Sequence, residues 1–200
     1  MKEEEKREGL ADLIQLAYRL GASHAKIIRA ADISVEDDLA NLCREPQCEN
    51  YGLSASCPPH VSGPSGFRAS LRNFKQALVF KIDVPSEILF SSERQDLFRL
   101  LHEIAAGIEQ SAVQIGYHHS RAYAGGSCKR LFCQDHPKCQ VLSEGGECRN
   151  PDHARQSMSG FGINVSKLMQ VAGWTMHRIT PGTAPDKTSM GTVCGLILIG

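Results

Sequence analysis

Two long stretches of the chain carry apolar side chains at helical spacing. In residues 10–20 and 97–115, the apolar positions recur every three or four residues, which places them on one face of an amphipathic helix. A glycine suited to a C-terminal cap follows each stretch: Gly21 and Gly116. Ser92 and Gln95 have the spacing of a capping box and are expected to start the second helix.

Two shorter helices are predicted further along the chain. Residues 67–74 fit a short helix, and the apolar positions between Val165 and Ala172 have helical spacing. Asn164 suits the N-cap of this last helix and Gly173 suits its C-cap. Residues 31–42 are mixed in character and predict a loop with one helical turn.

Short apolar runs predict the strands of a sheet. They cover residues 25–30, 76–84, 118–124, 174–180 and 193–199. Strands and helices alternate without a regular period, and the last two strands are expected to pair antiparallel. The order therefore predicts an α/β sandwich of the α+β type, in which helices pack on a mixed sheet of about five strands. Two cysteine-rich loops are expected at the edge of this sheet.

Composition indicates one globular domain over residues 1–200, with a charged, frayed lead-in over residues 1–8. The chain has 42% hydrophobic residues, and its 22 basic residues balance 22 acidic ones. Because nucleic-acid-binding domains usually carry a basic excess, nucleic acid is not an expected partner. No apolar run approaches the roughly 20 residues that cross a bilayer, so no membrane association is expected. The charged, acidic start is unlike a secretory signal, which favours the cytoplasm.

Eight cysteines change this picture, because seven of them cluster in two glycine- and proline-rich loops. The first group is Cys43, Cys48 and Cys57, and the second is Cys128, Cys133, Cys139 and Cys148. In a reducing compartment, clustered cysteines are more often metal ligands or catalytic thiols than disulfides. Cys194 lies in an apolar run and is expected to pack in the core.

The spacing of the second group satisfies either a zinc ion or an iron–sulfur cluster. Structural zinc sites tend to use ligand pairs two to four residues apart, whereas this group has one x4 pair and nothing tighter. The wider spacing favours a 4Fe-4S cluster, whose ligands stand further apart. Gly125, Gly126 and the pair 145–146 precede ligands, and their backbone N–H groups are expected to approach the cluster sulfides.

The first group has only three thiols. Two prolines follow Cys57 directly. In ferredoxin-type clusters, one proline often follows a ligand cysteine. A fourth ligand is available from Cys194, His60 or a carboxylate; alternatively one iron stays open for substrate or water, or all three thiols are free. The sequence leaves these alternatives open.

Other polar residues near the cysteines carry weaker signals. Three histidines lie inside the cysteine loops and are candidate ligands or donors: His60, His136 and His153. Five lie in predicted regular structure and are expected to be surface or hydrogen-bonded core residues: His24, His102, His118, His119 and His177. Three cations flank ligands and either balance thiolate charge, dock an acidic partner or are simply solvated: Lys129, Arg130 and Arg149. Nucleotide-binding and hydrolase motifs are absent from the sequence.

Two segments, residues 48–60 and 125–165, resemble an uncharacterised prokaryotic family of cysteine-rich predicted metal-binding proteins. The matching motifs are Cys48 with Tyr51-Gly52, Cys57-Pro58-Pro59, Gly125 to Cys128, Cys148 to Pro151, Ala154 to Met158 and Gly162 to Val165. Asn164 stands where the family usually has an acidic residue. The resemblance implies metal binding but no particular reaction.

Arg155 and Ser157 follow the last ligand in this matched motif. In one interpretation Arg155 binds a cluster sulfide or an anionic substrate, assisted by the Ser157 hydroxyl. In the other, which we favour, Arg155 pairs with a carboxylate and Ser157 starts a helical turn.

The sequence thus predicts a metal-binding protein with one or two 4Fe-4S clusters that serves in electron transfer or as a redox accessory module. The partner would be a redox protein or a small molecule. Two alternatives stand beside this one: a cluster-dependent enzyme of lyase or sulfur-removing type with an open iron, and a zinc-stapled module that binds a protein.

Overall fold

A single mixed sheet organises the computed structural model, which describes residues 3–143, 145–176 and 189–200. The strands are β1 (His24–Arg29), β2 (Gln76–Pro85), β3 (Arg121–Ala124), β4 (Gln156–Ser157) and β5 (Met190–Ile199). They lie in the order β1-β2-β5-β3-β4. The first three neighbouring pairs are antiparallel, and β4 runs parallel to β3 at one edge. The expected mixed sheet of about five strands is confirmed.

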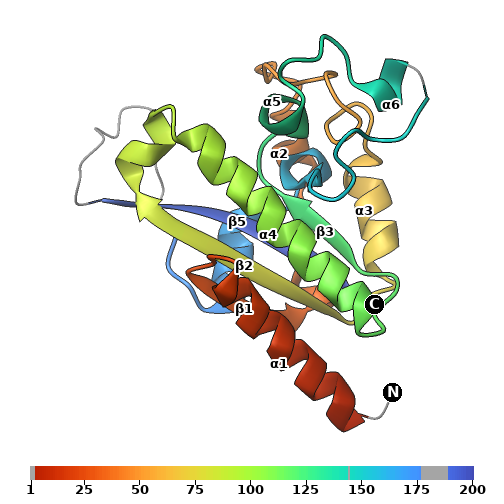
Figure 1. The fold of residues 1–200 in the computed structure, drawn as a ribbon, viewed down its shortest axis with the longest axis vertical. Helices are drawn as coiled ribbons and strands as arrows, with labels where there is room; N and C mark the ends of the chain where they lie inside the picture. The colour runs from red at the N-terminus through yellow and green to blue at the C-terminus, as the bar shows by residue number, and fades with distance from the viewer. Residues whose placement is uncertain (1–2, 144, 177–188) are drawn as a thin grey trace.

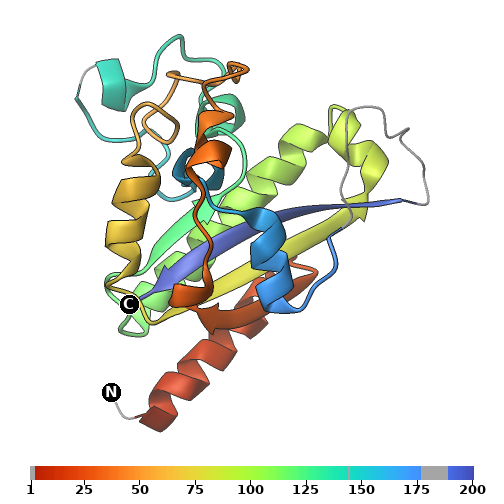
Figure 2. The same cartoon turned by 180° about the vertical axis from the view of Figure 1, so that it is seen from behind.

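Helices cover both faces of this sheet (Figures 1 and 2). In the described ranges they are α1 (Glu3–Arg19), α2 (Asp37–Asn41), α3 (Gly63–Leu71), α4 (Arg94–Gln114), α5 (Cys128–Phe132), α6 (Gln140–Ser143) and α7 (Val165–Ala172). Helices α1 and α4 pack on one face, whereas α3 and α7 pack on the other. The architecture is therefore an α+β sandwich.

The two faces explain why β2 carries an uninterrupted apolar run over residues 77–80. Leu78, Phe80 and Ile82 belong to the core under α1 and α4, whereas Ala77 and Val79 belong to the core under α3 and α7. Successive side chains of a strand point to opposite faces, so a stretch covered on both sides carries apolar residues at successive positions.

Several boundaries differ from the sequence predictions. The backbone is already helical at Glu3, inside the lead-in that was expected to be frayed. Strand β3 begins at Arg121, three residues later than predicted, and the two-residue strand β4 was not predicted. The predicted strand over 174–180 is not found at residues 174–176, and its remainder lies outside the described residues. A strand as short as β4 has no period of its own for a sequence pattern to reveal.

The helix caps give one confirmation and one correction. Asn164 caps α7, since its side-chain oxygen accepts a hydrogen bond from Lys167 N at 2.9 Å. The predicted capping box of Ser92 and Gln95 is wrong, because α4 begins later, with Glu93 at its N-cap. The amide of Gln95 instead donates to Arg130 O at 2.7 Å, which ties α4 to the cysteine-rich end of the molecule.

Both cysteine-rich segments lie at the same end of the molecule, around α5 and α6 in Figure 1. The second segment connects β3 to β4, the two strands at one edge of the sheet. The first lies between α2 and α3, and Ser157 N of β4 donates to its Ser56 O at 3.0 Å. The sheet edge thus brings the two segments together. Among the described residues, we find no helix with the length and apolar content needed to span a bilayer.

We predict that Gly195→Ala destabilises the fold by about 1–3 kcal/mol, the usual penalty for overpacking a core. A Cβ at Gly195 of β5 would lie 2.4 Å from the ring of Phe80, which is fully buried in the core. Urea unfolding measures the change. Gly9→Ala in α1 is the control, because its nearest neighbour is the end of the Ile115 side chain and alanine favours a helix. Equal stability of Gly195→Ala and the unsubstituted protein would contradict the prediction.

Candidate metal centre

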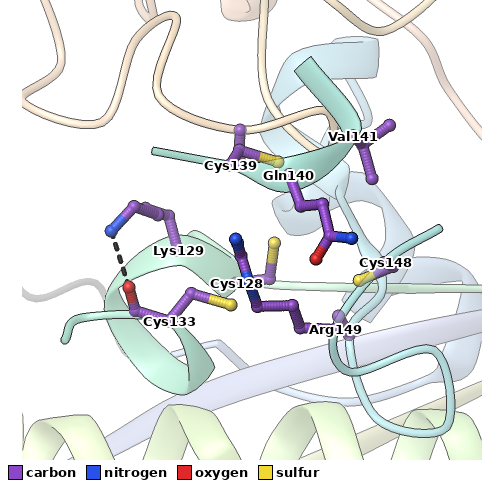
Figure 3. Close-up of a pocket in the computed structure, with 10 residues that line it drawn as sticks. Cys128, Lys129, Cys133, Cys139, Gln140, Val141, Cys148 and Arg149 are labelled. Atoms are coloured by element: carbon purple, nitrogen blue, oxygen red, sulfur yellow. Dashed lines mark hydrogen bonds between the residues drawn. The ribbon is translucent and has the colours of Figure 1, made fainter. Parts of the chain in front are cut away.

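The four cysteines of the second group line one hollow (Figure 3). Cys128 starts α5, Cys133 follows its last residue, and Cys139 immediately precedes α6. Cys148 comes from the loop that leads to β4. Free space in the hollow amounts to only about 20 Å³, and the side chains of Gln140 and Arg149 line it as well. The chain therefore gathers these four thiols around a common, narrow space.

One residue contacts two of these sulfurs. Asn150 donates a hydrogen bond from its backbone N to Cys148 Sγ at 3.4 Å and another from Nδ2 to Cys133 Sγ at 3.2 Å. Donors of this kind orient ligand sulfurs and stabilise negative charge on them. Asn150 was not singled out from the sequence, although its position two residues after Cys148 in the matched Cys-Arg-Asn-Pro motif is a usable signal.

The cations beside these cysteines hold the loops in place. Lys129 Nζ donates to Cys133 O at 2.6 Å and also to His136 O, so it closes the turn between the second and third cysteines of the group. Arg149 donates to Lys138 O at 3.1 Å. Arg130 pairs with Glu49 of the first segment at 3.2 Å. All three side chains thus have hydrogen-bond or ion-pair partners in the loops. Simple solvation, one of the alternatives expected for them, does not describe their surroundings fully.

The three cysteines of the first group line a second, much larger cavity of about 930 Å³. Cys48 N donates to Cys43 O at 3.0 Å, which closes a tight turn between them. Burial raises the pKa of Cys43, and the negative charges of Cys48 and Cys57 raise it further. Cys43 therefore lies within electrostatic reach of both other thiols. The second group surrounds a narrow space, whereas the first forms part of the wall of an open one.

Ser56 lies between the two groups. Its Oγ is 3.0 Å from Cys128 Sγ and 3.9 Å from Cys57 Sγ, and it hydrogen-bonds Ser54 Oγ at 2.9 Å. The sulfurs of Cys57 and Cys128 can be no further apart than the first two distances combined. The sequence could not say whether the two groups meet in space, and the structure brings them into adjacent positions.

Burial keeps the Cys128 thiol protonated at neutral pH. Its pKa is raised to about 11, chiefly by burial, while the hydrogen bonds from Ser56 and Ser54 act in the opposite direction. Because thiolates and not thiols bind metals, occupation of this centre must release a proton from Cys128.

Gly125 and Gly126 do not line the hollow of the second group, where they were expected to approach the cluster. They line the larger cavity of the first group, next to Phe98 of α4. A Cβ at either position would lie 3.0–3.1 Å from the Phe98 ring, and Gly126 has φ +81°, which favours glycine. Close packing on α4 accounts for both glycines, and their role in cofactor binding stays a prediction.

Arg155 points to α4 and lines neither cavity. Its Nε lies 2.6 Å from Glu109 Oε2, and its Nη1 donates to Pro151 O and Ala154 O at 2.9 Å. This confirms the carboxylate pairing that the sequence analysis favoured. A direct bond from Arg155 to a cluster sulfide or substrate has no support, because the guanidinium is already engaged. Ser157 precedes the 3₁₀ turn Met158–Phe161, also as favoured, and lines the larger cavity.

His102 of α4 joins the two ends of the second cysteine segment. Its side chain is fully buried; Nε2 donates to Gly125 O at 3.0 Å and Nδ1 accepts from Arg155 N at 3.1 Å. Both bonds require a neutral ring with its proton on Nε2. Burial lowers the pKa of His102 to about 4. The expectation of a hydrogen-bonded core histidine is confirmed here, but no pattern in the sequence indicated its partners.

The remaining candidates are placed as follows. The three histidines of the cysteine loops are exposed: His60, His136 and His153. Three of the histidines that were expected on the surface or in the core are exposed as well: His24, His118 and His119. His177 lies outside the described residues. Cys194 packs in the core under α3 and α7, as expected, which raises its pKa to about 12. Within the described part of the chain, no three His, Cys, Asp or Glu side chains stand close enough to hold a single ion.

We predict that His102 makes stability depend on pH between about 6.5 and about 4. Because its folded pKa is depressed, the unfolded chain binds the proton first, and the free energy of unfolding falls as pH drops through this window. The loss approaches about 3 kcal/mol. Urea unfolding of metal-free protein at several pH values measures it, and His102→Gln should flatten the slope. Parallel slopes for both proteins would argue against the prediction.

Comparison with known proteins gives one family match. The family model "Predicted metal-binding protein (DUF2284)" matches residues 26–199, a range that contains all eight cysteines. No curated protein and no solved structure matches the chain. The uncharacterised family of predicted metal-binding proteins expected from the cysteine motifs is therefore confirmed: the chain belongs to the DUF2284 family.

Proposed function

We propose that Cys128, Cys133, Cys139 and Cys148 hold a 4Fe-4S cluster and that the protein serves in electron transfer or as a redox accessory module. The observation that carries this proposal is that four thiols from one segment line one hollow. Four thiolates are the usual ligand set of such a cluster.

The donor chemistry of the hollow fits this cofactor. Thiolates are soft ligands suited to iron–sulfur clusters or zinc, and Asn150 supplies hydrogen bonds to two of the sulfurs. A cluster holds its ligand sulfurs further apart than one ion does, which agrees with four thiols that share a hollow without forming a single-ion group. Gln140 and Arg149 also line the hollow, and admission of a cluster requires them to move aside. Arg149 is exposed, so its movement displaces no core residue.

A bound cluster would supply one-electron transfer, with a potential governed by hydrogen bonds to sulfur and by solvent exposure. The residues of the chain have two tasks in this proposal. Asn150 and Ser56 contact ligand sulfurs and stabilise charge on them. Lys129 and Arg149 shape the loop and place positive charge beside it, which suits an acidic redox partner in the cytoplasm.

A second candidate function comes from the first group. Cys43, Cys48 and Cys57 provide three thiols at the wall of a cavity of about 930 Å³. Three protein ligands and an accessible open position are typical of catalytic metal centres. This arrangement favours a second cluster with an open iron, and hence a cluster-dependent enzyme acting on a small molecule. A zinc-stapled binding module is the third possibility, and the metal content tests it.

We predict that protein purified without oxygen is brown and contains iron and sulfide. Cys128→Ala, Cys133→Ala, Cys139→Ala and Cys148→Ala should each remove about four iron atoms, the content of one cluster. Cys194→Ala is the matched control and should keep its iron, because Cys194 lies in the core under α3 and α7. Iron, zinc and sulfide analysis measures the outcome. A colourless protein with stoichiometric zinc would contradict the proposal and support the zinc-stapled module.

We further predict that Asn150→Ala lowers the reduction potential of this centre and leaves its iron content unchanged. The substitution removes the Nδ2 bond to Cys133 Sγ, which stabilises the extra negative charge of the reduced state. Redox titration followed by EPR measures the potential. Asn41→Ala on the exposed surface of α2 is the control. An unchanged potential in Asn150→Ala would show that this donor does not act on the centre.

A further inference from the structure

The cavity beside the first cysteine group has the size of a small-molecule site. Its volume of about 930 Å³ is near the upper end of the range for ligand pockets, roughly 300–1,000 Å³. Cys43, Cys48 and Cys57 form part of its lining, and residues from α4, from the β3–α5 connection and from α7 are among the others. Two side chains in the lining, Ser127 and Arg94, have properties that point to a ligand.

Ser127 is the first. It is 4% exposed and lines this cavity, and its Oγ is buried without a hydrogen-bond partner among the described residues. Buried hydroxyl groups are normally satisfied, because leaving one unpaired costs about 1–3 kcal/mol. A ligand oxygen in the cavity would satisfy it.

Arg94 is the second. It is exposed, and its guanidinium lies 5.5 Å from the centre of the Phe98 ring, without an ion-pair partner in the described ranges. Lys167 lines the same cavity but already pairs with Glu36 at 2.7 Å. Arg94 is therefore available to a bound anion, and its planar fork matches the oxygens of a carboxylate or phosphate.

Phe98 connects Arg94 and the segment of Ser127 in space. Arg94 lies over its ring, and Gly125 and Gly126, which lead into Ser127, pack against the same ring. The cation thus lies over this aromatic ring, and the backbone that leads to the unpaired hydroxyl packs against the same ring in the cavity wall.

We propose that this cavity binds a small organic oxyanion, a carboxylate or phosphate, with its charged group at Arg94 and Ser127 and its other end toward the three thiols. The reactive end rests on the second candidate function, because only a centre at the first cysteine group would act on it. The anion-binding half needs no metal. The two parts can therefore fail separately.

Calorimetric titration of the metal-free protein with citrate and with inorganic phosphate tests the anion-binding half. We expect millimolar or tighter binding of at least one probe, and the probe that binds identifies the charged group. Arg94→Gln should weaken this binding about tenfold or more, as expected when a charge-assisted bond is lost. Ser127→Ala should weaken it severalfold.

Matched variants are available for both substitutions. Arg72→Gln removes an exposed arginine outside the cavity, and Ser120→Ala removes another buried hydroxyl without a described partner, also outside it. Neither should change the affinity. Absence of binding by both probes, or equal weakening by Arg94→Gln and Arg72→Gln, would overturn the proposal.

The anaerobically reconstituted protein tests the reactive end. A probe-induced change in the EPR spectrum that is lost in Arg94→Gln and in Cys57→Ala supports the whole proposal. Binding to the metal-free protein, with iron content unchanged by Cys43→Ala, Cys48→Ala and Cys57→Ala, supports the anion site and contradicts a centre at the first group.

Discussion

The buried imidazole of His102 is the contact on which the geometry of the second cysteine segment depends. One ring binds Gly125, where the segment leaves β3, and Arg155, where it returns to β4. The ion pair between Arg155 and Glu109 strengthens the return point. Both hydrogen bonds of the imidazole require the neutral ring. Burial of this α4 side chain keeps the ring neutral because it lowers the pKa. A long irregular segment that starts and ends at one rigid helix can hold four thiols in a defined arrangement.

The two cysteine groups are neighbours with different surroundings. The second group encloses a narrow hollow in which Asn150 contacts two sulfurs, as suits the electron-transfer centre proposed there. The first group faces a cavity large enough for a small molecule. Ser56 lies between Cys57 and Cys128 and hydrogen-bonds the latter. With a centre at each group, this proximity would allow a change at one to affect the other through a single hydroxyl.

Much of the fold could be predicted because its pattern is local. The apolar period of α4, the apolar run at residues 77–80 of β2 and the capping residue Asn164 each reflect forces within a few residues. The two-residue strand β4 and the start of α4 could not be predicted, since both depend on contacts with distant segments. Gln95 illustrates this: its spacing suited a capping box, but its amide binds Arg130, 35 residues away.

The sequence by itself determined the α+β class, the two groups of thiols and the membership of a metal-binding family, because composition, periodicity and spacing are properties of the chain. Only the tertiary structure decided that Cys57 and Cys128 lie close together, that Arg155 binds Glu109, and that Gly125 and Gly126 line the larger cavity. These contacts join residues far apart in the chain. They arise from the pairing of β4 with β3 at the sheet edge and from the packing of α4, and no short-range pattern encodes either.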